Sequence, residues 1–298
     1  MDLAQIASLQ PDQLRAIVPG FINSYFRDDP AIATQAEERV RQVLSTSTDQ
    51  EILETMALYG AAGQAYEPHE AALVLRRISR AYIPVPCGQA SPQGLEHLDE
   101  ARGRSQLWIC NHLSYVDTQV TDALLARAGR AEADDMLVVA GPKVYSEPFR
   151  RLAAVALNTL MTAQSSQIAT NSSGLSPREI ATIALTSLRQ AEAWRKERGP
   201  VLLYPEGSRS RTGRMGTFLR AAARYTRGVD LIVPVAITGS QDLFGFDERM
   251  RPARVSLTFG EPFTPGPGKT AGLEEAWRRV SALLPSDYAP TPDTVPVA

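Results

Sequence analysis

Cysteine and histidine are scarce in this chain of 298 residues, which contains two of the first and three of the second. Two cysteines, Cys87 and Cys110, cannot build a disulfide framework or a four-cysteine metal site. The three histidines, His69, His97 and His112, stand apart from one another, and none belongs to a close cluster of the kind that binds zinc. We therefore expect a reduced, cytoplasmic protein with no metal or other resident cofactor.

Long apolar runs and an excess of one charge are also missing. The most apolar stretch, 152–163, is interrupted by Asn158 and Thr159 and is too short to span a bilayer. The chain opens MDLAQIASLQ, without the basic start and apolar core of a signal peptide. Lysine and arginine number 31 against 33 aspartate and glutamate, so we expect no general binding to nucleic acid. We expect no integral membrane protein and leave peripheral contact with a membrane open.

The first 82 residues predict a helical region, a small bundle or cap. Apolar residues recur there at three- and four-residue spacings, and proline and glycine separate the periodic segments. The segment 83–94 contains several Pro, Gly and Ser residues and predicts a boundary to a second domain over 83–285. The remaining residues, 286–298, are rich in proline and predict a tail that is extended or unstructured.

Between residues 83 and 285 the pattern changes to short apolar segments that alternate with helical ones. The segments of strand length are apolar on both faces, as in strands covered by helices on both sides: 106–110, 136–140, 201–204, 231–237 and 255–259. The clearest helix, 177–198, begins with a Ser176 cap. This alternation predicts an α/β fold with a mixed, mostly parallel sheet covered by helices. Pro234 predicts that its strand is interrupted or lies toward an edge.

The first candidate site follows the strand predicted over 106–110. His112 stands just after it, and Asp117 stands five residues later, where the next helix begins. A carboxylate on one imidazole nitrogen fixes the tautomer and leaves the other nitrogen free to take a proton. The same spacing also suits plain helix initiation, because Ser114 and Asp117 can form a capping box. Both interpretations stay open on this motif alone.

The second candidate site follows the strand predicted over 201–204 and reads YPEGSRSRTGR over 204–214. Glycine-permitted turns, hydroxyls and three arginines suit an anion such as a phosphate or carboxylate. A solvated basic turn is the alternative, and Glu206 weakens it, since an acid inside a cationic loop suggests a defined polar network. Both candidate sites follow parallel strands, whose carboxyl ends meet at the edge of the sheet where ligands bind.

Together these segments resemble the glycerolipid acyltransferase superfamily, which includes the glycerol-3-phosphate and 1-acylglycerol-3-phosphate acyltransferases. NHLSYVD at 111–117 is similar to that family's N-H-x4-D block, and YPEGSRSRTG at 204–213 to its F-P-E-G-T-R-S-R-T-G block. VPVAITG at 233–239 resembles a later block of the family. The helical start and the segment from Gly141 are similar to the soluble, plastid-type glycerol-3-phosphate acyltransferases. That class carries basic residues where this chain has AQSS at 163–166, so the acceptor stays open.

The resemblance implies an O-acyltransferase that uses an acyl thioester. His112 would be the general base that deprotonates an acceptor hydroxyl, and Asp117 would orient it. The donor would be acyl-CoA or acyl-carrier protein as a co-substrate, and the acceptor glycerol-3-phosphate or a lysophosphatidate. The residues implied at the acceptor site are Glu206, Gly207, Ser208, Arg209, Arg211 and Lys143. Backbone N–H groups of the PEGS turn are candidates for binding the oxyanion.

Two alternatives remain beside this interpretation. The same chemistry on another lipid or small-molecule acceptor, such as an amino lipid or a specialised metabolite, would use the same base. A lipid- or carrier-binding protein that has lost catalysis would have no need of a base and its orienting carboxylate. The presence of both His112 and Asp117 argues against the second alternative.

Overall fold

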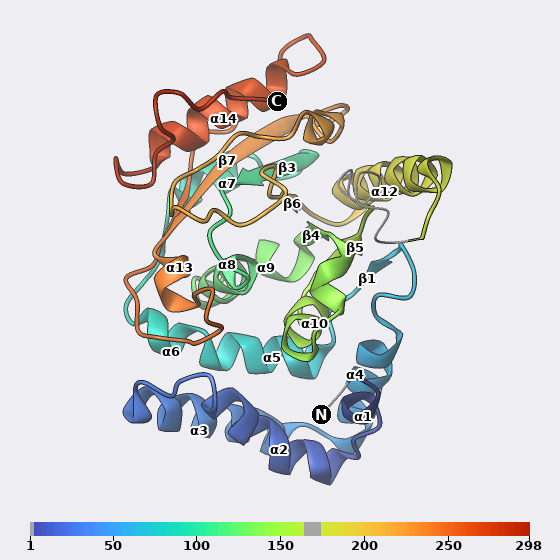
Figure 1. Ribbon diagram of the computed structural model, residues 1–298, viewed down its shortest axis with the longest axis vertical. Coiled ribbons are helices and arrows are strands. Elements are labelled where there is room, and N and C mark those ends of the chain that lie inside the picture. The colour runs from blue at the N-terminus through green and yellow to red at the C-terminus, as the bar shows by residue number, and fades with distance from the viewer. Residues whose placement is uncertain (1–2, 164–173) are drawn as a thin grey trace.

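The N-terminal region is helical, as predicted, in the computed structural model, which describes residues 3–163 and 174–298 (Figure 1). Its helices are α1 (Leu3–Ala7), α2 (Pro11–Asn23), α3 (Pro30–Thr46), α4 (Asp49–Ala61) and α5 (Leu73–Tyr82). The side chains of Asp29 and Thr48 accept hydrogen bonds from the first turns of α3 and α4, which explains where these helices begin. Helix α5 packs against α3 on one side and α8 (Asp117–Arg127) on the other. The N-terminal helices therefore share one core with the sheet.

The described residues form an eight-stranded sheet in the order β1-β5-β4-β6-β3-β7-β8-β2. The strands are β1 (Pro68–His69), β2 (Pro92–Gln93), β3 (Gln106–Cys110), β4 (Leu137–Ala140), β5 (Asn158–Met161), β6 (Val201–Leu203), β7 (Leu231–Thr238) and β8 (Ser256–Phe259). Strands β5, β4, β6, β3 and β7 pair in parallel, and β2 pairs in parallel with β8. Strand β8 runs antiparallel to β7, and β1 antiparallel to β5. The predicted α/β fold with a mostly parallel sheet is confirmed.

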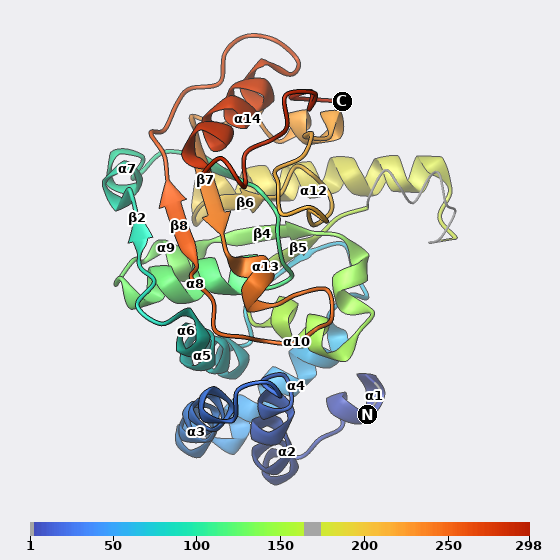
Figure 2. The same cartoon turned by 60° about the vertical axis from the view of Figure 1, so that its left-hand side comes forward.

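Helices cover both faces of the sheet (Figures 1 and 2). The further helices are α6 (Pro84–Cys87), α7 (Leu95–Glu100), α9 (Glu132–Asp135), η1 (Pro142–Tyr145), α10 (Pro148–Val155), α12 (Pro177–Glu197), η2 (Arg220–Arg224), α13 (Ser240–Leu243) and α14 (Ala271–Leu283). Side chains of β3 alternate between the two faces of the sheet. Trp108 and Cys110 pack on the face covered by α8 and the N-terminal helices, and Leu107 and Ile109 pack on the face covered by α12 and α14. This two-sided burial explains why β3 is apolar at nearly every position.

Strand β5 was not predicted from the sequence, and neither were the two-residue strands β1 and β2. Asn158 and Thr159 interrupt the apolar run around β5, yet both are buried and bind backbone groups. The Asn158 amide accepts from the Ala71 N–H at 3.0 Å and donates to the Met136 carbonyl at 3.1 Å, and the Thr159 hydroxyl donates to the Ala154 carbonyl at 2.9 Å. Buried polar side chains with such partners are compatible with a strand. The sequence pattern alone does not reveal those partners.

The expectation for Pro234 is wrong, because β7 runs uninterrupted in the interior of the sheet between β3 and β8. The Pro234 carbonyl accepts from the Gly260 N–H at 2.8 Å, so the ring nitrogen faces the same neighbour. The β7–β8 ladder extends from Thr238 back to the pair Val235–Phe259, next to Pro234, and the next pair is Ile232–Phe263 on the other side of Pro234. The missing N–H therefore falls in a local break of the neighbouring strand, where proline removes no ladder hydrogen bond.

The proline-rich tail, 286–298, forms turns at 286–288 and 292–293 and packs against the rest of the chain. The tail lies alongside residues 215–220, which come after the arginine-rich loop in the sequence. The N–H groups of Met215, Phe218 and Arg220 donate to tail carbonyls at 2.8, 3.0 and 2.6 Å. The Arg214 guanidinium also donates to the carbonyls of Ser286 and Ala289. The tail thus holds the chain that follows the second candidate site.

Candidate active site

The residues that follow β3 place His112 at the carboxyl edge of the sheet. The Asn111 side chain exchanges two hydrogen bonds of 2.9 Å with the backbone of Ile237 in β7, which fixes the direction in which the chain leaves β3. The imidazole Nδ1 of His112 lies 2.8 Å from Oδ2 of Asp117. Since a carboxylate accepts, Nδ1 carries the hydrogen and Nε2 is the nitrogen left for a substrate. The His112 side chain is 19% exposed, so it is reachable from solvent.

The carboxylate of Asp117 is 1% exposed and uses a single oxygen for its hydrogen bonds. Besides the imidazole, Oδ2 accepts from the N–H groups of Leu113 at 2.7 Å and Ser114 at 3.0 Å. The reciprocal half of a capping box does not form, because the Asp117 N–H donates to the Ser114 carbonyl and the Ser114 hydroxyl accepts from the Val116 N–H at 3.4 Å. That hydroxyl donates to the Phe244 carbonyl at 2.7 Å. Within the described residues, Oδ1 of Asp117 is buried without a hydrogen-bond partner. Asp117 therefore faces the imidazole and the loop that carries it.

The ring of Tyr204 supports the imidazole from one face. The two rings stack with centroids 4.5 Å apart and planes 29° apart. The Tyr204 hydroxyl lies 3.0 Å from the Thr118 hydroxyl on α8, and burial raises the pKa of Tyr204 well above its ordinary value. The imidazole is thus held in place by a carboxylate at its edge and an aromatic ring on its face.

Glu206 bridges the two candidate loops. Its Oε1 accepts from the His112 N–H and its Oε2 from the Gly216 N–H, each at 2.8 Å. The loss of hydration on burial raises the pKa of Glu206 to about 7, although both hydrogen bonds act in the opposite direction. The Ser210 N–H donates to the His112 carbonyl at 2.8 Å, which adds a second link. Both oxygens of Glu206 are occupied by backbone groups, so this residue positions the two loops relative to each other.

Gly207 makes the tight turn after β6 possible. Its φ is +69°, and a Cβ atom there would lie 2.5 Å from the Leu219 side chain, so only glycine fits without rearrangement. Its N–H donates to the Tyr204 carbonyl at 3.1 Å and is therefore not free for an oxyanion. In the described part of the chain, the N–H groups of Ser208 and Arg209 have no such acceptor. Ser208 itself is exposed.

The guanidinium of Arg209 rests on two aromatic rings. Its Cζ lies 3.5 Å from the centroid of Tyr115 and 4.2 Å from that of Phe246. Burial lowers the pKa of Arg209, which nevertheless keeps its charge because arginine does not deprotonate in proteins. Its Nη1 is buried and has no hydrogen-bond partner among the residues the structure describes. A stacked cation with an unused donor is suited to an anionic ligand.

The structure brings together His112, Asp117, Glu206, Gly207, Ser208 and Arg209 at one edge of the sheet. Arg211 is exposed farther along the loop. Lys143 is exposed on η1, after β4, and forms no hydrogen bond or ion pair with the other predicted residues in the described part of the chain. Of the segment 163–166, which carries no basic residue, residues 164–166 lie outside the described residues.

Sequence reasoning assigned no role to four residues that surround this site: Tyr115, Arg150, Tyr204 and Phe246. Tyr115 and Tyr204 lie inside the two motifs, so their positions could have signalled them. Arg150 and Phe246 come from other segments of the chain, and no local pattern marks them.

At the carboxyl edge of this α/β sheet, a histidine–carboxylate pair lies beside an arginine-bearing loop, an arrangement that is compatible with acyl transfer. The model of the protein family described as Acyltransferase matches residues 91–238, about half of the chain and both candidate loops. The chain belongs to this family, that of the glycerolipid acyltransferases, whose members transfer acyl groups to lipid acceptors. A comparison with curated proteins finds no match. Among the described residues, no helix is long and apolar enough to cross a membrane.

Proposed function

We propose that the chain transfers a fatty acyl group from acyl-CoA or acyl-carrier protein to a hydroxyl of glycerol-3-phosphate or a lysophosphatidate. The observation that carries the proposal is the 2.8 Å contact between His112 Nδ1 and Asp117 Oδ2. Glu206 fixes this pair next to the loop of Arg209. A base and an anion-binding group at one edge match an acceptor that carries both a hydroxyl and a phosphate.

In this mechanism His112 Nε2 takes the proton of the acceptor hydroxyl, and the oxygen attacks the thioester carbonyl carbon. The imidazolium that forms is stabilised by the buried carboxylate of Asp117. The tetrahedral intermediate then collapses, the C–S bond breaks, and the thiolate takes the proton back from His112. The products are the acyl ester and the free thiol, and no protein nucleophile is acylated.

The negative oxygen of the tetrahedral intermediate needs hydrogen-bond donors that are already in place. The Gly207 N–H is occupied by the Tyr204 carbonyl, so the free N–H groups of Ser208 and Arg209 in the same turn are the better candidates. The Arg209 guanidinium would bind the phosphate of the acceptor. The turn after β6 would then serve both the reacting carbonyl and the acceptor.

The test combines purified protein with acyl-CoA or acyl-carrier protein and a panel of acceptors, and identifies products by mass spectrometry. The panel contains glycerol-3-phosphate, a lysophosphatidate, their uncharged analogues and amino lipids. His112→Ala should lower kcat by at least about 10², the usual contribution of a general base. His97→Ala is the matched control, because His97 lies on α7 and, among the residues that the structure describes, its ring pairs only with the exposed Glu100.

Each outcome decides between the alternatives. Esters of the phosphate acceptors support the proposal, whereas amide products or esters of other alcohols would support the same chemistry on another acceptor. Full activity in His112→Ala would remove the base from the mechanism. Binding of acyl-CoA or carrier protein without any product would support a binding protein.

A further inference from the structure

The segment that follows the turn after β6 is rich in arginine and lacks acidic residues. Residues 207–229 contain six arginines and neither aspartate nor glutamate, although acidic residues outnumber lysine and arginine by 33 to 31 in the whole chain. The six are Arg209, Arg211, Arg214, Arg220, Arg224 and Arg227. None of them forms an ion pair with another described residue, so their charges are not neutralised within the part of the chain that the structure describes.

Four of these arginines are exposed, and together we call them the arginine strip: Arg211, Arg220, Arg224 and Arg227. The second and third of them are the first and last residues of η2, whose Ala222 and Ala223 are buried in the core. This short helix therefore presents its cations to solvent. Exposed positive charges without a neighbouring acid attract acidic molecules from solution.

The strip begins beside the proposed reacting centre. Ser210, the residue before Arg211, donates its N–H to the His112 carbonyl at 2.8 Å. Leu219, the residue before the next member of the strip, donates to the Pro205 carbonyl in the turn after β6, also at 2.8 Å. The strip ends shortly before β7, which starts at the opposite edge of the sheet. Cations that lead from the site toward the far edge suit a protein that covers a surface better than a small ligand that fills one pocket.

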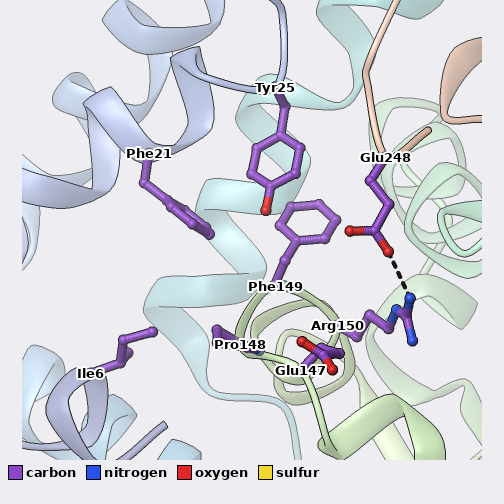
Figure 3. Close-up of a pocket in the computed structure, with 8 residues that line it drawn as sticks. All are labelled: Ile6, Phe21, Tyr25, Glu147, Pro148, Phe149, Arg150 and Glu248. Atoms are coloured by element: carbon purple, nitrogen blue, oxygen red, sulfur yellow. Dashed lines mark hydrogen bonds and ion pairs between the residues drawn. The ribbon is translucent and has the colours of Figure 1, made fainter. Parts of the chain in front are cut away.

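Arginines on and near the segment 244–251 are paired instead. Arg150 donates to Oε1 of Glu248 at 2.6 Å, at the edge of a pocket of about 190 Å³ whose other side is lined by aromatic rings (Figure 3). Arg249 and Arg251 each bind Asp28 at 3.2 Å. The absence of ion pairs in its described surroundings therefore distinguishes the strip from these other arginines.

The composition of the strip favours a protein partner over a lipid surface. Segments that lie in the surface of a membrane combine cations with several large apolar side chains. In the described segment 207–229, Leu219 is the one large apolar side chain that is exposed. Phe246 is exposed as well, but it covers Arg209, which does not belong to the strip. Cations with few apolar neighbours match a partner whose surface carries carboxylates.

We infer that the arginine strip is the docking surface of an acidic acyl-carrier protein, which makes the carrier protein the acyl donor. The inference rests on the proposed function and selects one of its two donors. Docked on the strip, the carrier would bring its thioester to the turn after β6, where the N–H groups of Ser208 and Arg209 are proposed to bind the oxyanion. The acyl group would pass to the acceptor oxygen as described above, and the thiol would stay on the carrier.

The test measures acyl transfer, to the acceptor that the wild type prefers, from acyl-carrier protein, acyl-CoA and a neutral acyl thioester of N-acetylcysteamine. Arg220→Glu/Arg224→Glu reverses two charges of the strip. Its KM for acyl-carrier protein should rise by about tenfold or more, since the reversed charges repel the carboxylates that the arginines attract. Its kcat with the neutral thioester and its melting temperature should equal those of the wild type.

Arg178→Glu/Arg189→Glu is the matched control. It also reverses two exposed arginines that form no ion pair in the described part of the chain, but both lie on α12, outside the strip. This control should leave KM for acyl-carrier protein unchanged. An equal rise in the control would show that only the overall charge matters, and it would overturn the inference.

Salt dependence and direct binding give two further measurements. Ions screen the attraction between exposed charges, so the wild-type rate with acyl-carrier protein should fall as sodium chloride is added, while the rate with the neutral thioester should not. Calorimetric titration with acyl-carrier protein, without an acceptor, measures Kd independently of turnover. The strip variant should bind the carrier about tenfold more weakly than the wild type does.

Unchanged KM and Kd for acyl-carrier protein in the strip variant would overturn the inference while acyl transfer stands. An equal rise in KM for acyl-CoA would also overturn it, because the strip would then attract any anionic donor. Sedimentation with vesicles of phosphatidylglycerol and phosphatidylcholine tests the lipid alternative: loss of vesicle binding alone would assign the strip to a membrane. If no donor supports acyl transfer, the proposed function fails, and the titration still decides whether the strip binds the carrier.

Discussion

Replacing Asp117 by asparagine should remove the charge beside His112 and keep the geometry of the loop. One oxygen, Oδ2, accepts from the imidazole and from the N–H groups of Leu113 and Ser114, whereas Oδ1 has no partner in the described part of the chain. Asparagine can place its carbonyl oxygen where Oδ2 of Asp117 lies and its amide nitrogen where Oδ1 lies. The hydrogen on Nδ1 of His112 then stays where it is, and the variant measures the effect of the charge.

The magnitude follows from the separation of the two charges. The hydrogen-bonded atoms are 2.8 Å apart, and the charge centres of the imidazolium and carboxylate are about 4 Å apart, where unit charges interact by about 4 kcal/mol at an effective dielectric constant near 20. Asp117→Asn should therefore lower kcat by about 10² to 10³. Asp117→Ala also leaves two backbone N–H groups without an acceptor, at about 1–3 kcal/mol each, so it should unfold at a clearly lower temperature.

Release of free thiol from acyl-CoA measures kcat, and thermal unfolding followed by circular dichroism measures stability. Asp99→Asn on α7 is the matched control, since the Asp99 side chain is 52% exposed and pairs with Arg102 and Arg130, away from His112. The reasoning requires that Asp117→Asn lose activity while its melting temperature stays well above that of Asp117→Ala. If Asp117→Asn keeps kcat within about threefold of the wild type, the carboxylate charge does not assist the base, since the charge predicts a far larger loss.

Two further predictions concern stability. Because the pKa of Glu206 rises from an ordinary 4.5 to about 7 in the folded chain, its stabilising contribution is present below pH 4.5 and is lost as the pH rises through 7. Urea unfolding at several pH values between 4.5 and 7 measures the free energy of unfolding of the wild type and of Glu206→Gln. Over this range the wild-type value should fall by up to about 3 kcal/mol more than the value of the variant. Parallel pH profiles of the two proteins would contradict this prediction. Removing residues 291–298 takes away the carbonyls that accept from Phe218 and Arg220, so kcat and melting temperature should both fall relative to the full chain. Unchanged values would show that the tail does not support the loop.

The layered fold and the two candidate loops were predictable because their signals are local. The strand before His112 is apolar on both faces, and His112 and Asp117 lie five residues apart, so one segment places both. The errors arose where distant partners decide the outcome. Pro234 is tolerated because the neighbouring strand breaks beside it, and Asn158 is tolerated because its amide binds three backbone groups from other segments.

The residues around the site were also not predictable where their roles depend on partners distant in the sequence. Glu206 was expected to shape the acceptor site, but its two oxygens accept from the backbone of His112 and Gly216, a role that depends on residues 94 and 10 positions away. Arg150 and Phe246 reach Tyr115 and Arg209 only through the packing of α10 and of loop 244–250. Such neighbours follow from the tertiary fold, and a single sequence carries no periodic pattern for them.

The double attachment of Glu206 has a consequence for how this enzyme could diverge. One carboxylate ties the backbone of the base-bearing loop to that of the arginine loop, so neither can shift without the other. New substrate preferences would therefore arise most readily in segments that Glu206 does not link, on α10 and on loop 244–250. Single amino-acid substitutions there alter which side chains surround an incoming molecule. The reacting centre would be inherited unchanged while its surroundings vary from one descendant to the next.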